Sequence, residues 1–373
     1  MSIQLVIGGG IAGLATAYHL GCRGTAQVVL LERGTQLGSE ASAQNAGILR
    51  TFGTDLETRE LARASAKFMR TPPAGFGESF VEPIGVLLLG DAERKATWRT
   101  ILEEAPDRDL LRGEGLREVT TDEVRVLAPN VRSPFEVALW CPRDGKIAIR
   151  RLIDALARNA QQLGVEIRTG SAVARLLTHE GGVTGCELKD GTRIPSTSIV
   201  LAAGAWAARL GAPAGSRVRL RPTRRHLALT SPVALERQSP VVWTEAGGFY
   251  HRPKSGGALV CLCDEEDVDP DALEVDPGMA GRLLERARRE LSGMGDVKIA
   301  QVWSGIRTLT SEGRFQVGPD PDVAGLHWAA GLGGHGMSCG LEIGRRVAEG
   351  MGTTCRSLPR SPQTPRSSPQ IPS

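Results

Sequence analysis

The chain has 373 residues, of which 41% are hydrophobic and 23% charged, and its formal net charge is +3. These values are typical of a globular protein, and the length favours two lobes over one. They argue against a nucleic-acid-binding surface, because Arg356, Arg360 and Arg366, in an acid-free stretch near the C-terminus, account for the whole excess charge. No apolar run reaches the roughly 18–20 residues that cross a bilayer. The N-terminal run lacks the basic segment of a secretory signal, so we expect a cytoplasmic protein.

The start of the chain predicts a βαβ unit. Residues 3–7 are typical of a buried strand, residues 11–20 of a helix, and residues 28–31 of a second strand. A connection of about 20 residues is long enough to join two parallel strands.

Three glycines join the first strand to the helix. They form the pattern Gly8-x-Gly10-x-x-Gly13, and Glu32 ends the next strand. The first glycine permits a tight turn, the second lets a pyrophosphate approach the backbone, and the third lets the helix pack on the strand. N–H groups at the helix start attract phosphate, and a carboxylate at Glu32 can accept from ribose hydroxyls. The motif predicts that the domain binds a dinucleotide but does not show which one. The alternative is a glycine-rich turn in a domain that binds no nucleotide.

The next part of the chain mixes helices and strands. Residues 56–69 predict a helix, residues 86–89 a strand and residues 92–104 a charged helix. A short strand and a helix capped at Thr121 or Asp122 follow.

A second α/β region begins near residue 142. A helix with an apolar face over 149–160 precedes strands with hairpin turns at Gly181-Gly182 and Asp190-Gly191. The later elements are an apolar strand ending at Gly204, strand-like residues 217–263, a helix over 280–291, and a closing strand, glycine-rich turn and helix. Segments at the start, middle and end of the chain therefore predict one discontinuous nucleotide-binding domain, with a second domain made from the insertions.

Six blocks of the sequence occur in a characteristic order between residues 6 and 349. They are "VIGGGIAGLATAYHL…VVLLER", "CPRDGKIAIRRLIDAL", "GVEIRTGSAVARLL", "VLAAGAWAARL", "WSGIRTLTSEGRFQVGPD" and "WAAGLGGHGMSCGLEIGRRVAE". In these blocks the chain resembles the FAD-dependent amine oxidoreductases of the D-amino-acid oxidase, glycine oxidase and sarcosine oxidase family.

The resemblance implies an α/β fold with a discontinuous, Rossmann-like FAD-binding domain of the glutathione-reductase type and an α+β substrate domain on a mixed or antiparallel sheet. We expect the FAD-binding domain over 1–80, 142–215 and 300–354, and the substrate domain over 81–141 and 216–299. Residues 355–373 are rich in serine and proline, which predicts a disordered tail.

The family pattern also implies which residues contact FAD. The ADP half would be bound by Gly8, Gly10, Ile11, Ala12, Gly13, Glu32 and Arg33. The flavin would be lined by Ser42, Gln44, Asn45, Ala46 and Gly47. Val173 would face the adenine, and Ala203, Gly204 and Trp206 would pass beside the cofactor, with Arg307 also near it. Backbone N–H groups near the flavin carbonyls would come from Gly331, Gly333, Gly334, His335, Gly336 and Met337, where they would stabilise negative charge.

The resemblance further implies how the cofactor is held. Covalent members attach flavin through a cysteine that would fall near Gly305, and no cysteine lies between Cys263 and Cys339, so we expect non-covalent FAD. Cys261 and Cys263 would share a strand face without further ligands, so no metal site is expected.

Four residues are implied as the substrate site: Arg307, Tyr250, His335 and Arg50. An arginine suits a substrate carboxylate. Hydride passes from the substrate carbon to flavin N5, so the protein mainly orients the substrate. On a strand, His251 should face away from Tyr250, and His226 is a weaker candidate than His335.

The resemblance leaves the substrate and the electron acceptor open. Sarcosine-type members have a lysine where this chain has Ser338, and another near Val260. The favoured function is oxidation of the C–N bond of an amino acid or related amine to an imine, with oxygen, a quinone or another carrier as acceptor. The alternatives are dehydrogenation of a 2-hydroxy acid and a non-catalytic flavin-binding subunit.

Overall fold

The computed structural model describes residues 2–233, 235 and 238–351. The predicted tail, residues 355–373, lies outside these described residues. Within them, the fold has two principal sheets, and the residues of the candidate site lie where the two sheets meet.

The first sheet is built from the start, middle and end of the chain. Its six strands follow the order β20-β21-β13-β1-β2-β9, and all neighbours are parallel except the β20–β21 pair. In that order the strands are Gln316–Pro319, Leu326–Ala330, Ser198–Leu201, Ile3–Ile7, Gln27–Leu31 and Glu166–Arg168. This arrangement agrees with the predicted discontinuous α/β domain.

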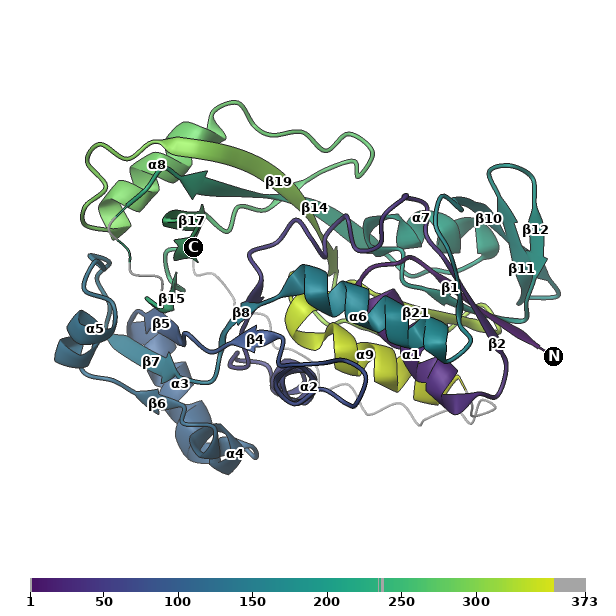
Figure 1. Ribbon diagram of the computed structural model, residues 1–373, viewed down its shortest axis with the longest axis horizontal. Helices are drawn as coiled ribbons and strands as arrows, with labels where there is room; N and C mark the ends of the chain where they lie inside the picture. The colour runs from purple at the N-terminus through teal and green to yellow at the C-terminus, as the bar shows by residue number, and fades with distance from the viewer. Residues whose placement is uncertain (1, 234, 236–237, 352–373) are drawn as a thin grey trace, which may run out of the picture.

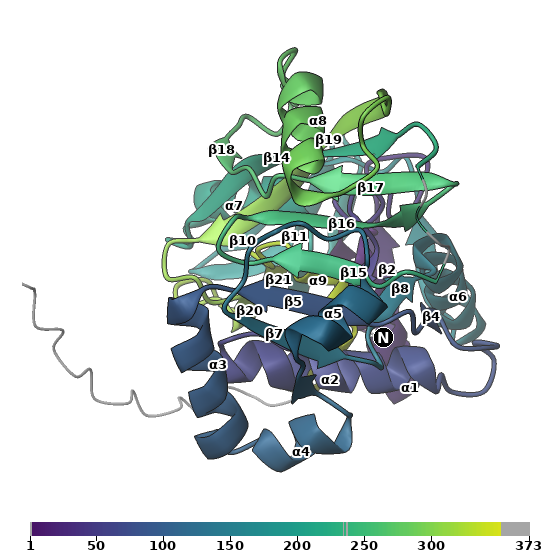
Figure 2. The ribbon, with the colours of Figure 1, turned by 90° about the vertical axis from the view of Figure 1, so that its left-hand side faces the viewer.

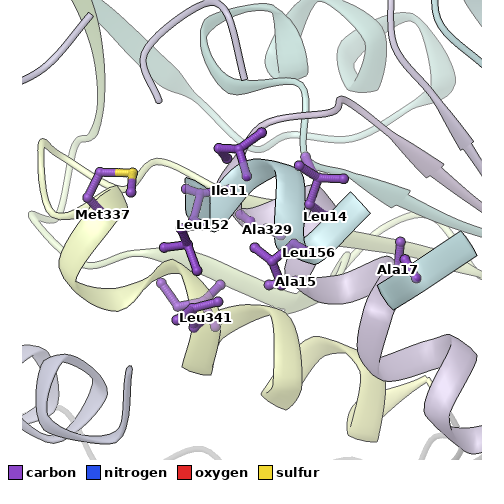
Figure 3. Packing of buried hydrophobic residues seen from close by; sticks show 14 of the residues in the cluster. Ile11, Leu14, Ala15, Ala17, Leu152, Leu156, Ala329, Met337 and Leu341 are labelled. Carbon is purple, nitrogen blue, oxygen red and sulfur yellow. The ribbon is translucent and has the colours of Figure 1, made fainter. Parts of the chain in front are cut away.

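Three helices cover one face of this sheet: α1 (Ile11–Arg23), α6 (Ile149–Gln162) and α9 (Gly336–Gly350) (Figure 1). Figure 3 shows Ile11 and Leu14 of α1 in one cluster with Leu152 and Leu156 of α6 and Leu341 of α9. The helix α2 (Leu56–Arg70) packs on α9.

The other face of the sheet is covered by three antiparallel strands and a short helix. These are β10 (Val173–His179), β11 (Gly182–Leu188), β12 (Arg193–Pro195) and α7 (Ala207–Gly211). Strand alternation explains both layers, because Val6 contacts the helices whereas Leu5 and Ile7 contact the three-stranded layer. The sheet is therefore buried on both faces.

The second sheet follows the order β18-β14-β17-β16-β15-β5-β7-β6, with β19 paired to β14. In that order, and ending with β19, the strands are Glu266–Asp267, Leu220–Thr230, Gly257–Cys261, Phe249–Lys254, Val241–Thr244, Val86–Gly90, Val137–Cys141, Arg117–Glu118 and Ile299–Thr310. Only the β15–β5 pair is parallel, which agrees with the predicted mixed sheet. Figure 2 shows β17, β16, β15, β5 and β7 side by side.

Four helices pack around the second sheet, and a small third sheet accompanies the first two. The helices are α3 (Ala92–Glu104), α4 (Arg108–Gly113), α5 (Thr121–Leu127) and α8 (Met279–Glu290). The small sheet has the order β3-β8-β4, with strands Ile48–Leu49, Gly145–Ile147 and Val81–Glu82.

The long strand β19 pairs with β14 along almost its whole length. The predicted domain boundary at residue 300 falls at the start of β19, although that strand belongs to the second sheet. The division into domains at the stated residues stays a prediction.

The N-cap of α5 lies one residue before Thr121, the first of the predicted cap positions Thr121 and Asp122. Its N-cap is Thr120, whose side chain accepts a hydrogen bond from Glu123 N at 3.2 Å, while Thr120 N donates to Glu123 Oε2 at 2.8 Å. The glutamate three residues after the cap completes this reciprocal pair and fixes the N-cap at Thr120, so the helix starts at Thr121. In the part of the chain that the structure describes, no helix has both the length and the apolar character needed to span a bilayer.

Candidate active site

The glycine turn between β1 and α1 is crowded by backbone at two of its three motif positions. Gly8 has φ +113°, and a β-carbon there would lie 2.4 Å from the carbonyl oxygen of Ala202. A β-carbon on Gly13 would lie 1.9 Å from Gly8 O. At Gly10, by contrast, the nearest atom is the side-chain oxygen of Ser42 at 3.2 Å. Gly10 therefore leaves open space in front of the helix start.

This space belongs to a cavity of about 440 Å³ that reaches the second sheet. Many of the residues singled out from the sequence line it, namely Gly8, Gly10, Ile11, Ala12, Glu32, Arg33, Ser42, Gln44, Asn45, Val173, Ala203, Gly204, Trp206, Tyr250, Arg307, Gly331, Gly333, Gly334, Gly336 and Met337. Five residues expected at the site do not line the cavity: Gly13, Ala46, Gly47, Arg50 and His335.

Two of these other residues shape the segment after β2. Asn45 Oδ1 accepts a hydrogen bond from Gly47 N at 2.7 Å, and the carbonyl of Ala46 accepts one from Arg252 Nε at 2.6 Å. Gly13 lets α1 pack against the turn, as described above. These residues lie outside the cavity lining and hold in place the segments that form its wall.

The carboxylate of Glu32 is held by two backbone N–H groups. Gly9 N donates to Oε2 and Gly34 N donates to Oε1, both at 2.7 Å. Each oxygen keeps further acceptor capacity, so Glu32 can hold the turn and still accept from a ligand hydroxyl. Ser42 Oγ accepts from Ile11 N at 3.0 Å and so ties the segment after β2 to the start of α1.

One end of the cavity is lined by residues from segments that follow strands of both sheets. The guanidinium of Arg33 lies 3.5 Å over the ring of Trp206, and Trp206 Nε1 donates to Asp271 Oδ1 at 2.7 Å. Arg209 also donates to Asp271. Asp271 and Arg209 line the cavity but were not predicted from the sequence. Asp271 could not be placed there because it lies far along the chain, in a loop after β18.

The other end of the cavity is formed by the second sheet. Tyr250 on β16, Arg307 on β19 and Arg225 on β14 line it together. Burial, followed by the neighbouring Cys261, raises the pKa of Tyr250 well above its ordinary value, so its phenol stays protonated. Burial and the nearby Arg225 guanidinium lower the pKa of Arg307 from its ordinary value.

Arg225 is not among the residues expected at the site from the sequence, although its neighbour His226 is a weaker candidate there. His226 is buried and held as a structural residue, with Nδ1 2.7 Å from Asp264 Oδ2 and Nε2 accepting from Asp276 N at 3.0 Å. Alternation along the strand was the signal that could have found Arg225, because residues 225 and 226 face opposite sides. The same rule places Tyr250 on the cavity and His251 away from it, as expected.

Arg50 is engaged by other side chains rather than free toward the cavity. Its Nη1 lies 2.7 Å from Glu245, its guanidinium carbon lies 4.6 Å over the ring of Trp243, and its Nε donates to Phe52 O at 2.9 Å. His335 is the N-cap residue of α9, and its ring lies 6.0 Å from that of Phe315. Burial, followed by the charge of Arg50, lowers the pKa of His335 to about 4, so it is neutral at pH 7.

The sequence matches the FAD dependent oxidoreductase family from residue 5 to residue 350. The chain belongs to this family, which is also named DAO. It is 30% identical over 372 residues to the glycine oxidase of Geobacillus kaustophilus, covering 92% of this chain and 91% of that protein.

Solved structures of family members show the same fold. The crystal structure of glycine oxidase from Geobacillus kaustophilus superposes with a TM-score of 0.79 at 26% identity, covering 94% of this chain and 95% of that one. L-proline dehydrogenase from P. horikoshii superposes with a TM-score of 0.84 at 23% identity, covering 93% and 92%. The expected fold class is therefore confirmed.

FAD is the cofactor of this family, and the cavity of this chain fits it. The helix start at Ile11 faces the open space at Gly10, and such a start attracts phosphate. Non-covalent attachment of FAD stays a prediction. The attachment cysteine of covalent members would fall near Gly305, which lines the cavity. A β-carbon at Gly305 would lie 2.7 Å from Gln44 O.

Proposed function

We propose that this FAD-dependent oxidoreductase oxidises the C–N bond of an amine that carries a carboxylate, such as an amino acid, to an imine. The observation that carries the proposal is that, in the described part of the chain, the guanidinium of Arg307 faces the cavity without an acidic partner. It lies on the wall of the cofactor cavity, and among the described residues no carboxylate pairs with it. The glycine oxidase and L-proline dehydrogenase relatives support amino acids as the substrate class.

An enclosed guanidinium without a counter-charge is costly, and a ligand carboxylate removes that cost. Arginine binds carboxylates through two parallel hydrogen bonds, which fix orientation as well as position. Tyr250 lines the same end of the cavity with a protonated phenol that can donate a hydrogen bond. Arg307 and Tyr250 would therefore orient the substrate.

When bound, FAD would supply the two-electron oxidation as the hydride acceptor. What the chain itself contributes is position. The turn from Gly331 to Gly334 and the side chain of Arg307 meet at one end of the cavity, so a carboxylate on Arg307 is held near the cofactor-binding turn. Positioning of this kind supplies a large part of the rate enhancement when the reactants are held within contact distance.

The test is anaerobic mixing of the holoenzyme with amino acids, N-methyl amino acids and other amines, and separately with 2-hydroxy acids. Loss of the visible flavin absorbance with the amines alone supports the proposal. Reduction by 2-hydroxy acids alone supports the dehydrogenase alternative, and no reduction by any of them supports a non-catalytic flavin subunit.

Arg307→Met should weaken binding of a carboxylate substrate by about 1.5–3 kcal/mol, which is roughly ten- to hundred-fold in Kd. Arg314→Met is a matched control, because Arg314 is exposed in the loop after β19. An unchanged Kd in the Arg307 variant would remove Arg307 from the site.

A further inference from the structure

A second arginine faces the substrate end of the cavity. Arg225 is 6% exposed and lines the same cavity as Arg307. Across the β14–β19 pair, Arg225 stands opposite Gly305 and Arg307 opposite Thr223. The two arginines are therefore diagonal neighbours on one face of the sheet, at a backbone separation of about 7–8 Å.

Arg225 is held in place by neutral groups. Its Nε donates to the carbonyl of Asp264 and its Nη2 to that of Cys263, both at 3.0 Å. These bonds orient the guanidinium and leave Nη1 without a hydrogen-bond partner among the described residues. Carbonyl groups do not cancel the positive charge.

The acids near this end of the cavity are engaged elsewhere. Asp264 accepts from the backbone N of His226 at 3.0 Å and lies 2.7 Å from its ring Nδ1, and Glu245 pairs with Arg50. In the described ranges neither Arg225 nor Arg307 has an ion-pair partner. Two like charges therefore share one end of the cavity, and Arg225 contributes to the lowered pKa of Arg307.

A buried arginine elsewhere in the fold does have an acidic partner. Arg59 is 2% exposed, and Asp107 receives two hydrogen bonds from it, at 2.9 Å from Nε and 2.8 Å from Nη2. This internal pair satisfies the guanidinium without a ligand. Among the described residues Arg225 has no such acid, so a carboxylate partner for it has to come from a ligand.

We propose that the substrate carries two carboxylates, one bound by Arg307 and the other by Arg225, so that the enzyme acts on dicarboxylic amino or imino acids. This inference rests on the proposed oxidation of an amine and names its substrate class. A single carboxylate would leave one enclosed guanidinium uncompensated, whereas two would neutralise both.

The first experiment measures ligand binding to the holoenzyme by the change in flavin absorbance. Malonate, succinate and glutarate are each compared with propionate, butyrate and pentanoate, the monocarboxylates of equal carbon number. We expect one dicarboxylate to bind at least tenfold more tightly than its partner. A preference below twofold for all three pairs would overturn the proposal.

The second experiment assigns the preference to Arg225. Arg225→Gln should reduce this preference to less than threefold, chiefly by weakening dicarboxylate binding, whereas Arg307→Gln should weaken the binding of both classes of ligand. Arg224→Gln is the matched control, since Arg224 is the adjacent arginine on the strand and pairs with Glu266. If Arg225→Gln does not fold, Arg225→Lys keeps the charge and should retain a preference; a preference unchanged in a folded Arg225→Gln would overturn the assignment.

Flavin reduction separates this inference from the proposed function. If monocarboxylic amines reduce the flavin with kcat/KM equal to or above that of every dicarboxylic amine, the inference fails and the proposed function stands. If dicarboxylates bind tightly but no amine reduces the flavin, the proposed oxidation fails while the two-carboxylate site stands.

Discussion

The guanidinium of Arg307 lies against the backbone of Gly334. A β-carbon added at residue 334 would lie 2.7 Å from Arg307 Cζ and 2.8 Å from Nη1. Gly334 has φ +95°, a conformation that glycine adopts readily and other residues rarely. The turn before α9 thus touches both the cofactor cavity and the arginine that we assign to the substrate.

This contact predicts the effect of Gly334→Ala. The added methyl group should displace the Arg307 guanidinium, so the Kd of a carboxylate ligand should rise about tenfold, the equivalent of one lost charged hydrogen bond. Gly333→Ala is the control, because Gly333 also has a positive φ but its β-carbon would approach only Leu309 Cδ2, at 3.4 Å. Titrations of the two holoenzymes check the prediction; an equal loss in both would point to backbone strain instead of a displaced arginine.

Alanine substitutions at two glycines of the turn between β1 and α1 should affect stability and FAD affinity differently. Gly10→Ala should leave the apo-protein within about 1 kcal/mol of wild-type stability, because Gly10 has φ −77° and meets only a side-chain oxygen. It should raise the Kd for FAD at least tenfold, since the methyl group occupies the space for the pyrophosphate. Gly13→Ala should lower both stability and FAD affinity, because its methyl group would collide with Gly8 O. Urea unfolding and FAD titration of both apo-variants separate these outcomes.

The buried pair of Arg59 and Asp107 predicts a large loss of stability in Asp107→Asn. Burial alone would raise the pKa of Asp107, but hydrogen bonds from Arg59 and Arg63 outweigh it and lower the pKa to about 2. Removing the acid leaves two arginines uncompensated, so unfolding free energy should fall by about 3 kcal/mol. Asp109→Asn, at an exposed position two residues away, should change it by less than about 0.5 kcal/mol. Similar unfolding curves for the two variants would contradict this view of the pair.

The buried histidines predict how stability depends on pH. Burial lowers the pKa of His251 to about 4, below the value of about 6.5 in an unfolded chain. Between these values the unfolded state binds more protons, so stability should fall as the pH drops from about 6.5 to 4. His251→Leu should flatten this slope, whereas replacement of the exposed His179 should not. Urea unfolding across this pH range is the measurement, and an unchanged slope in His251→Leu would show that other groups cause it.

Local features of the chain could be predicted from the sequence. The first strand, the glycine turn and the helix after it follow from patterns of neighbouring residues, and the structure has them where expected. The starts of α2, α3 and α6 also agree with the apolar pattern. The cap of α5 was misplaced by one residue, because threonines stand at both 120 and 121 and only the first has Glu three residues later.

Features that depend on distant pairing could not be predicted in the same way. Arg225 reaches the cavity because β14 pairs with β19, whose residues come much later in the chain. Arg50 forms an ion pair with Glu245, which follows β15 and lies much later in the chain. The sequence motif could suggest an arginine at the site, but it could not show which arginine has an internal partner and which is left for a ligand.

The proposed function requires that an amine bearing a carboxylate reduces the flavin of this enzyme. Its most direct test is anaerobic reduction of the holoenzyme by matched pairs of an amino acid and the 2-hydroxy acid of the same carbon skeleton, including dicarboxylic pairs. We predict loss of the visible flavin absorbance with the amino acid of at least one pair and none with its hydroxy acid partner. Reduction by the hydroxy acids alone, or by no compound in the set, would contradict the claim.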